Sequence, residues 1–281
     1  MSKPRILDLF CGAGGCSVGY ARAGFDVVGV DIAPQPRYPF TFFRAEALGW
    51  LERQIWRGFI DDFDAIHASP PCQAYSVATL QHRDRHDYAD LVSPTRELLI
   101  ATGLPYVIEN VPGAPLLNPV MVCGSGLGIA RLRRHRLFEA NVALFGVPCA
   151  HGQNRDILSV VGHSEGSGKT GPGYLKADKE AAMGIDWMNR DELSEAIPPA
   201  YCQFIGEQLM AFLQRDGAPP HDDSSPVRTP GTSAFPGRRT DSPPSTGGLE
   251  GSGSSEHSLP SESGAIAECS LASSRGPDVS D

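Results

Sequence analysis

Short apolar runs alternate with longer amphipathic stretches along the first 111 residues. The apolar runs have the length of β-strands and lie at residues 5–10, 26–32, 40–45, 63–68 and 105–111. The stretches between them have helical character and lie at residues 18–24, 47–56 and 93–103. Strands that alternate with helices predict a parallel sheet with helices on both faces. The predicted fold class is therefore α/β, with a doubly wound, mostly parallel sheet.

The helix predicted at residues 93–103 carries a start signal in its sequence. A serine side chain can accept a hydrogen bond from the first turn of a helix, and proline fits the first helical position because it lacks an N–H group there. Ser93 is therefore predicted to be the N-cap, with Pro94 as the first helical residue.

Polar residues and glycines gather where the predicted strands end. The ligands of doubly wound sheets collect at the carboxyl ends of the strands, so these positions are the first candidates for a site. Four stretches of interest lie there: residues 8–15, Asp31, residues 69–73, and Glu109 with Asn110.

A glycine-rich stretch, DLFCGAGG, follows the first predicted strand and opens a helix. Gly12, Gly14 and Gly15 allow a ligand to approach the backbone at the N-terminus of that helix. Asp31 ends the second strand, where doubly wound folds hydrogen-bond a ribose diol. The stretch does not match GxGxxG, and no basic residue follows it to hold phosphates. A nucleoside without a pyrophosphate fits better than a dinucleotide, and S-adenosylmethionine is such a nucleoside.

Two further side chains suit a bound nucleoside of this kind. Phe10 can pack against the adenine or the methionine portion. Glu46, after the third strand, can accept a hydrogen bond from the adenine amine, although a surface position without any ligand accounts for Glu46 equally well.

The stretch SPPCQ, residues 69–73, stiffens the backbone around one thiol. Proline fixes its own φ and drives the preceding residue toward extended geometry, so residues 69–71 are predicted to form a rigid exit from a strand. Such an exit can aim Cys72 at a fixed point. A turn that contains a buried, inert cysteine is the alternative, and free cysteines often fill cores in this way.

The composition changes from Asp216 onward to proline, serine, glycine, threonine and scattered charge, which cannot bury a core. Residues 216–281 hold ten acidic and four basic residues, a net charge of −6, which leaves −3 of the total of −9 for residues 1–215. A near-neutral folded part with a local basic cluster is compatible with nucleic-acid binding. That cluster is RLRRHR, residues 131–136, for which a solvated charge run is the alternative.

Cysteine usage and hydropathy indicate a reducing compartment. The seven cysteines are odd in number and irregularly spaced, which argues against a disulfide framework. Cys149 and His151 form a weak metal signal, because a tetrahedral site needs two more ligands and the neighbouring sequence supplies none, so no metal is expected. No apolar run is long enough to span a bilayer, and MSKPRILDLF lacks the pattern of a signal peptide. We expect a cytoplasmic protein.

An ordered set of short motifs resembles the DNA (cytosine-5) methyltransferase family. The motifs are DLFCGAGG, VDI, SPPCQAYS, ENV and RLRRHRLFE, in the family's order, across roughly residues 3–213. The resemblance implies that Cys72 is the nucleophile and that Glu109 holds the base. It implies that Arg134 and Arg136 contact the cytosine and hold the active-site loop. It also implies S-adenosylmethionine as the cofactor, bound by Phe10, Gly12, Gly14, Asp31, Ile32, Glu46 and Pro71.

The resemblance implies a covalent mechanism. Cytosine C5 is not nucleophilic enough to take a methyl group until a thiolate has added at C6. Glu109 would protonate or hydrogen-bond N3 while arginine stabilises O2. The target nucleotide must leave the stacked duplex. The loop after the nucleophile offers candidate phosphate contacts, with a solvated loop as the alternative: His82, Arg83, Arg85 and His86.

The sequence departs from the family's motifs at two places. Leu132 stands where the arginine motif normally begins with glutamine. Ser194 and Glu195 replace a Gly-Asn pair near the C-terminus, and the lost asparagine bears on the geometry of the cofactor site. Residues 198–206 still resemble the closing helix, which is expected to pack beside the first strand.

The resemblance divides the chain into four parts. Residues 1–140 are expected to form a catalytic and cofactor-binding domain and residues 141–182 a short target-recognition region. Residues 183–215 would add helices that complete the catalytic domain, and residues 216–281 would form a disordered tail. Compact enzymes of this kind occur in bacteriophages. The expected partner is double-stranded DNA, with no membrane, and a monomer is expected.

Two alternatives to a DNA methyltransferase remain open at this point. The same residues could serve a cytosine in a tRNA loop that is already unstacked. The chain could instead be a binding protein that retains affinity for cofactor or DNA but has no activity. The intact set of Cys72, Glu109 and Arg136 argues against this second alternative, because a decayed site usually loses its nucleophile.

Overall fold

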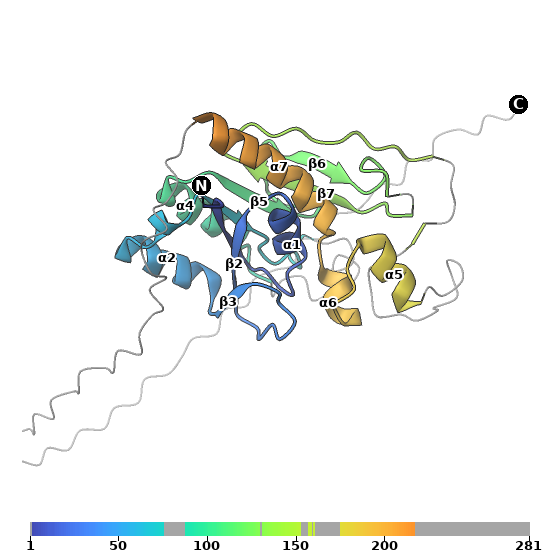
Figure 1. Ribbon diagram of the computed structural model, residues 1–281, viewed down its shortest axis with the longest axis horizontal. Helices are drawn as coiled ribbons and strands as arrows, with labels where there is room; N and C mark the ends of the chain where they lie inside the picture. The colour runs from blue at the N-terminus through green and yellow to red at the C-terminus, as the bar shows by residue number, and fades with distance from the viewer. Residues whose placement is uncertain are drawn as a thin grey trace, which may run out of the picture. The chain divides into compact units, whose positions relative to one another are not determined.

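The computed structural model describes residues 2–75, 88–129, 131–152, 157–158, 160 and 175–216 (Figure 1). All of them lie in one compact unit that spans Met1–Val227. The strands are β1 Arg5–Leu9, β2 Asp26–Asp31, β3 Thr41–Arg44, β4 Ala65–Ala68, β5 Tyr106–Asn110, β6 Val120–Cys123 and β7 His135–Ala140. The helices are α1 Gly15–Arg22, α2 Ala47–Arg57, the short η1 Ile60–Asp62, α4 Val92–Thr102, α5 Lys176–Met183, α6 Arg190–Glu195 and α7 Pro199–Asp216.

The seven strands form one sheet in the order β3-β2-β1-β4-β5-β7-β6. Strands β1 to β5 pair in parallel, and β7 pairs antiparallel with both β5 and β6. Within the described residues, β7 therefore runs against the other strands of the sheet. The predicted doubly wound, mostly parallel α/β fold is confirmed, and the antiparallel pair at one end is an addition that the sequence did not predict.

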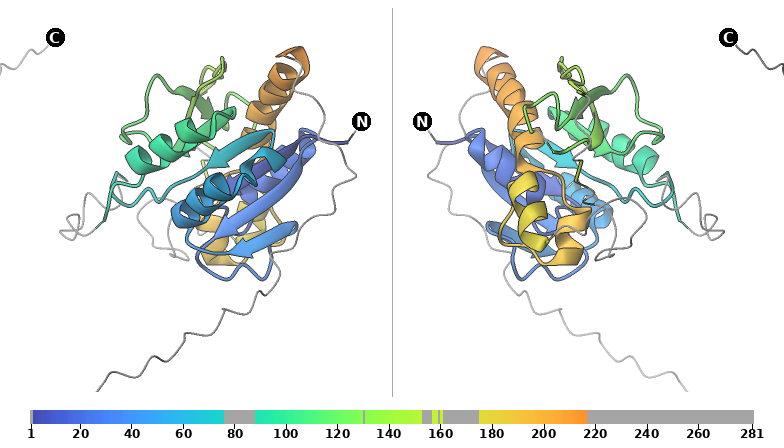
Figure 2. Two further views of the ribbon diagram at one scale, coloured as in Figure 1. Left: turned by 90° about the vertical axis from the view of Figure 1, so that its left-hand side faces the viewer. Right: turned by 90° about the vertical axis from the view of Figure 1, so that its right-hand side faces the viewer.

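Helices cover both faces of the sheet, as Figures 1 and 2 show. Side chains alternate between two apolar clusters, because successive residues of a strand point to opposite faces. Ile6 of β1 packs in the cluster that includes Tyr20 of α1 and Leu209 of α7. Leu7, the next residue, packs with Leu51 of α2 and with Leu99 of α4 in the other cluster. Helices α2 and α4 thus cover one face, and α1 and α7 cover the other together with residues of α5 and α6.

Strand register places the predicted site stretches at one edge. Leu9 of β1 pairs with Val30 of β2 and with Ala68 of β4. Ala68 pairs in turn with Ile108 of β5. The residues that follow these four are Phe10, Asp31, Ser69 and Glu109. The prediction that they meet at the carboxyl edge of the sheet is therefore confirmed.

Two predicted helix starts are wrong in detail. Helix α4 begins at Val92 with Leu91 in the N-cap position, so Ser93 is not the cap. Asp90 takes over the capping, because its Oδ1 accepts from Val92 N at 2.8 Å. Helix α1 begins at Gly15 and ends at Arg22, earlier than predicted at both ends.

The closing helix α7 packs against α1, and its Leu209 lies in the same apolar cluster as Ile6 of the first strand. A Cβ atom on Gly19 of α1 would lie 2.3 Å from Pro199 O, so only glycine allows this approach. A Cβ atom on Gly206 of α7 would likewise lie 2.9 Å from the Tyr20 ring. Glycine on each helix lets the two backbones come close together.

No described helix has the length and apolar character needed to cross a membrane.

Several predicted features lie outside the described residues. They are the tail predicted at 216–281 apart from Asp216, which ends α7, the candidate phosphate contacts at 82–86, and part of the predicted target-recognition region at 141–182. The division of the chain into four parts stays a prediction.

Candidate active site

The loop that carries Cys72 is held at both ends by hydrogen bonds. Ser69 N donates to Leu9 O at 3.1 Å, and Tyr75 N donates to Cys72 O at 3.0 Å. Between them, the Asn110 side chain donates from Nδ2 to Pro70 O at 2.9 Å. Asn110 thus fastens the rigid proline segment to β5, a task that the sequence alone did not reveal. The half-buried thiol of Cys72 projects from a loop with little freedom.

Glu109 is the adjacent residue of β5 and is almost fully buried. Arg136 of β7 lies beside it, with Nε 2.9 Å from Oε1. This ion pair lacks the alignment of a hydrogen bond, so Oε1 has no aligned donor among the described residues. Burial raises the pKa of Glu109, although Arg136 and the Ser69 hydroxyl offset part of that shift. The carboxyl group therefore keeps its proton to a higher pH than an ordinary glutamate does, which suits a group that donates to a ring nitrogen.

The electrostatics at Cys72 connect it with the same residues. Burial raises the pKa of the Cys72 thiol, the positive charge of Arg136 lowers it, and the negative charge of Glu109 raises it again. Protonation of Glu109 removes one of the effects that oppose the thiolate. The nucleophile and the acid are thus coupled, because charge lost at one favours charge at the other.

Arg134 links the arginine cluster to the end of α6. Its Nη2 donates to Ser194 O at 3.0 Å and lies 3.4 Å from Glu195 O. Its Nε and Nη1 are buried and have no acceptor among the described residues. Burial and the neighbouring charge of Arg136 lower the pKa of Arg134 to about 9. Two buried donors without acceptors suit an oxygen atom supplied by a ligand.

The two departures from the family motifs have local explanations. Arg134 reaches backbone carbonyls of Ser194 and Glu195, so side-chain identity there does not decide these contacts. Leu132 is buried in the core. A Cβ atom on Gly124 would lie 2.5 Å from Leu132 O, so the turn after β6 closes tightly over this position.

The glycine loop has the strained and open geometry of a binding loop. Phe10, which is not glycine, has a φ of 58°, and Gly12 and Gly14 have φ values of 49° and 90°. Asp31 holds the loop, because Gly12 N donates to Oδ2 and Ala33 N donates to Oδ1, each at 2.9 Å. A Cβ atom on Gly12 would meet nothing within 4 Å, so space for a ligand remains above the loop.

The other predicted cofactor residues differ in what they offer. Ile32 is 67 % exposed at the end of β2, which leaves an apolar side chain free for a flat ring. Pro71 is exposed on the loop of Cys72. Glu46 is engaged elsewhere, because its two oxygens cap α2 by accepting from Leu48 N at 3.0 Å and Gly49 N at 2.7 Å. A role for Glu46 with adenine stays a prediction and would require it to share these oxygens.

Two supports of the glycine loop were missed by sequence reasoning. Trp187 donates from Nε1 to Ala13 O at 2.9 Å, although the residues are 174 positions apart. Beneath the loop, the Ser17 hydroxyl donates to Asp8 Oδ2 and lies 2.9 Å from the Tyr38 hydroxyl. No local pattern marks these contacts, because they join segments that meet only in the folded chain.

Asp8 gives a prediction about pH. Burial raises the pKa of its carboxyl group from 3.8 to about 7, so Asp8 stabilises the fold fully below about pH 4, and this contribution is lost as pH rises through 7. Asp8→Asn removes this loss. As pH rises from 4 to 8, the free energy of unfolding of the variant should therefore increase relative to that of the wild type by at least ~1 kcal/mol. This lower bound is smaller than the free energy that corresponds to a shift of one pKa unit, about 1.4 kcal/mol. Urea unfolding measures this difference. Asp26→Asn, at an exposed surface ion pair, is the control, and parallel pH curves for Asp8→Asn and wild type would contradict the assignment.

Comparison with known proteins places this geometry in context. Residues 4–115 match the family model of C-5 cytosine-specific DNA methylases. The Type II methyltransferase M.AplI of Arthrospira platensis is 33 % identical over 161 residues, which are 56 % of this chain and 45 % of that protein. The Type II methyltransferase M.XorII of Xanthomonas oryzae pv. oryzae is 29 % identical over 189 residues, 59 % of this chain and 42 % of that protein. The chain thus spans less than half the length of these two relatives.

A solved structure has a similar fold. It is a candidate DNA modification methyltransferase encoded within an E. coli prophage, with a TM-score of 0.52 and 15 % sequence identity. The similarity covers 75 % of this chain and 99 % of that one. At this identity, the similarity shows the fold and nothing further.

Proposed function

We propose that this chain, whose residues 4–115 match the family model of C-5 cytosine-specific DNA methylases, belongs to that family and transfers a methyl group from S-adenosylmethionine to C5 of a cytosine in double-stranded DNA. The observation that carries the proposal is the meeting of three groups at one sheet edge. They are the aimed thiol of Cys72, the buried carboxyl of Glu109, and the guanidinium of Arg136 beside it.

The cofactor would sit over the glycine loop. The space above Gly12, the exposed apolar side chain of Ile32 and the spare lone pairs on the Asp31 carboxylate fit a nucleoside with a ribose diol. S-adenosylmethionine supplies the methyl group when it is bound there. Phe10 and Gly14 shape the loop, and the exposed Pro71 would border the cofactor from the side of the nucleophile.

The reaction begins with the thiol. Cys72 loses its proton to solvent and adds as a thiolate to C6 of the cytosine, which turns C5 into an electron-rich carbon. Glu109 donates its proton to N3 as the adduct forms, so the ring does not accumulate negative charge. Arg134 and Arg136 supply donors for O2. Methyl transfer to C5 leaves S-adenosylhomocysteine. Water then takes the C5 proton, the bond between Cys72 and C6 breaks, and N3 returns its proton to Glu109, which restores the aromatic ring.

Labelled methyl transfer tests the proposal. Purified protein with methyl-labelled S-adenosylmethionine should label duplex DNA, and bisulfite sequencing of DNA from expressing cells should show protected cytosines in a fixed sequence context. The same assay with tRNA distinguishes an RNA enzyme. Label in tRNA alone would replace the DNA substrate with RNA, and label in neither would favour a binding protein without activity.

The ribose contact gives a further prediction. Asp31→Ala should weaken S-adenosylmethionine binding by about 1.5 to 3 kcal/mol, the range for lost hydrogen bonds to a charged group. Titration calorimetry measures it. Asp61→Ala is the matched control, because Asp61 is an exposed carboxylate that precedes β4, at the opposite edge of the sheet. Asp31→Asn, which keeps an acceptor for Gly12 N, separates ribose binding from loop support. Unchanged affinity in Asp31→Ala would remove Asp31 from the cofactor site.

A further inference from the structure

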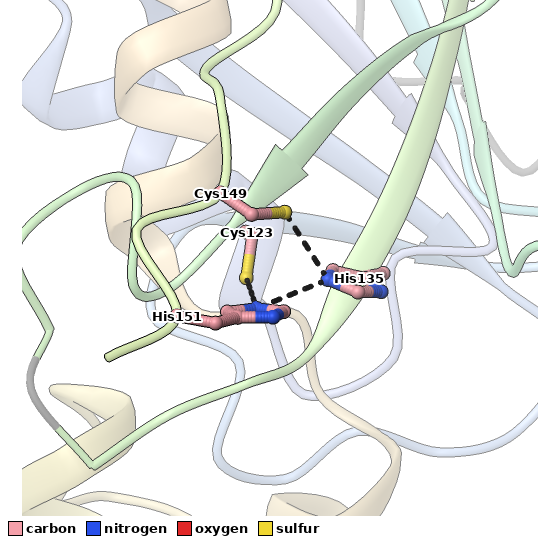
Figure 3. A group of neighbouring side chains, drawn as sticks. All are labelled: Cys123, His135, Cys149 and His151. Atoms are coloured by element: carbon pink, nitrogen blue, oxygen red, sulfur yellow. Dashed lines mark hydrogen bonds between the residues drawn. The ribbon is translucent and has the colours of Figure 1, made fainter. Parts of the chain in front are cut away.

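Four potential metal ligands converge away from the glycine loop, as Figure 3 shows. Cys123 ends β6, His135 begins β7, and Cys149 and His151 follow on the segment after β7. Cys123 and His135 are paired across the two strands, which puts them on the same face. The expectation that Cys149 and His151 lack nearby partners is therefore wrong, because strand pairing brings two more ligands to them.

The distances between these side chains are those of a tetrahedral site. Cys123 Sγ lies 3.3 Å from His151 Nε2, Cys149 Sγ lies 3.4 Å from His135 Nε2, and the two Nε2 atoms are 3.4 Å apart. All four ligand atoms lie within 4.8 Å of one another. Zinc bonds of about 2.0 Å to nitrogen and about 2.3 Å to sulfur, at tetrahedral angles, separate the ligand atoms by about 3.3 to 3.8 Å.

Hydrogen bonding alone does not account for this arrangement. A ring nitrogen carries either one proton or one lone pair in the plane of the ring, so it makes one good hydrogen bond. His135 Nε2 faces both Cys149 Sγ and His151 Nε2, and His151 Nε2 faces both Cys123 Sγ and His135 Nε2 (Figure 3). A single cation at the centre uses all four atoms at once.

The chain builds a support around the four ligands. Val147 N donates to Met121 O at 3.0 Å, which lays the segment before Cys149 along β6. A Cβ atom on Gly126, in the turn after β6, would lie 2.6 Å from Pro148 O, so the turn and the segment are in close contact. Ser125 Oγ accepts from Ala150 N at 3.2 Å and lies 3.2 Å from Cys123 Sγ. A contact to a ligand of this kind orients it in metal sites.

We propose that Cys123, His135, Cys149 and His151 bind one Zn²⁺ ion. Two thiolates and two imidazoles form a closed tetrahedral set, which is the composition of structural zinc sites. On binding, the two thiols lose their protons, and the two thiolate charges balance the charge of the ion. With four protein ligands no position remains open for a substrate, so the site holds structure and performs no chemistry.

The position of the site gives it a consequence for β7. His135 lies between Arg134 and Arg136, and Arg136 pairs across the strands with Val122, next to Cys123. An ion at His135 therefore fixes the start of the strand that carries both arginines. It also fastens residues 149–152 to the β6–β7 pair.

A second cluster in the described part of the chain serves as a contrast. Cys16, His67 and Cys202 also lie within reach of one another, but they offer three ligands and are fully buried. His67 already has a partner at each nitrogen, with the Tyr20 hydroxyl and the Ser69 hydroxyl both at 2.9 Å. This cluster is core packing with hydrogen bonds, and it provides matched control variants.

Metal analysis of the full-length protein tests the proposal independently of methyl transfer. Protein prepared with Zn²⁺ and dialysed should retain about one equivalent, and Co²⁺ in its place should give the visible bands of a tetrahedral thiolate site. Cys149→Ser and His151→Ala change ligands on the exposed segment, so the fold should persist by circular dichroism. Each should weaken Zn²⁺ binding, measured against a chromophoric chelator, by at least ~100-fold, beyond the effect of outer-shell partners. Cys202→Ala should retain the ion.

Three results would overturn the proposal. They are a wild-type protein that holds no Zn²⁺ against the chelator, folded Cys149→Ser and His151→Ala variants that bind it as tightly as the wild type, or a Co²⁺ spectrum without thiolate bands. If Cys202→Ala loses the ion while Cys149→Ser and His151→Ala retain it, which is a case of the second result, the ion lies in the buried cluster.

Discussion

Cys72→Ser should abolish methyl transfer and covalent capture of DNA together. Duplex DNA with 5-fluorocytosine at the target should become trapped on the wild-type protein when S-adenosylmethionine is present, because fluorine replaces the proton that must leave before the thiol can be expelled. The trapped complex should survive boiling in detergent. Serine cannot replace the thiol, since an alkoxide forms far less readily than a thiolate at neutral pH. Denaturing electrophoresis of labelled DNA reads the result.

The controls for this experiment come from the other thiols. Cys202→Ala removes a cysteine in the α1–α7 interface and should leave trapping intact. Trapping should also disappear when the cofactor is omitted. A Cys72→Ser protein that methylates DNA at a comparable rate would show that the covalent mechanism is wrong and that the Pro-Pro-Cys loop is only a rigid turn.

Glu109→Gln should slow methylation by about 10² to 10⁴, the usual range for a positioned acid or base. Glutamine has nearly the same shape and can still donate a hydrogen bond from its amide, but it cannot transfer a proton to N3. Single-turnover rates measure the loss. Burial raises the pKa of Glu109, so the wild-type rate should fall once pH exceeds that raised value, and the variant should lack this limb. Arg136 stays in place but loses its ion pair.

A matched control separates this effect from a general loss of carboxylate charge. Glu97→Gln changes an exposed residue of α4 and should leave the rate unchanged. If Glu109→Gln keeps full activity with an unaltered pH profile, the acid role belongs to another group.

Much of the sheet could be predicted from the sequence, because its signals are local. Each parallel strand is a short apolar run, and some of these strands carry a polar residue near the carboxyl end, such as Asp31 in β2 and Glu109 in β5. Strand register then brings these residues to one edge. The pair β6 and β7 was missed, because β6 has four residues and its partner begins within a charged cluster.

The details that the sequence did not predict have both local and long-range causes. Asp90 rather than Ser93 caps the start of α4, because the Asp90 carboxylate, two residues before the helix, accepts a hydrogen bond from Val92 N. The sequence predicts Glu46 as a ligand contact or a surface residue, and its role as the N-cap of α2 was missed. Cys149 and His151 were read without Cys123 and His135, because only the antiparallel pairing of β6 and β7 brings the four together. Spacing along the chain does not encode such a pairing.

The contacts of Trp187 and α7 set an order of events during synthesis. The ribosome makes the glycine loop and α1 first, and Trp187, which holds Ala13, is 174 residues later. At about 5 to 20 residues per second, this interval lasts roughly 10 to 35 seconds. Throughout it, the face of α1 that α7 will cover is exposed on the nascent chain, with Tyr20 and Cys16 unprotected. A segment made before α7 is thus covered only after α7 emerges, and its apolar surface is open to aggregation during that interval.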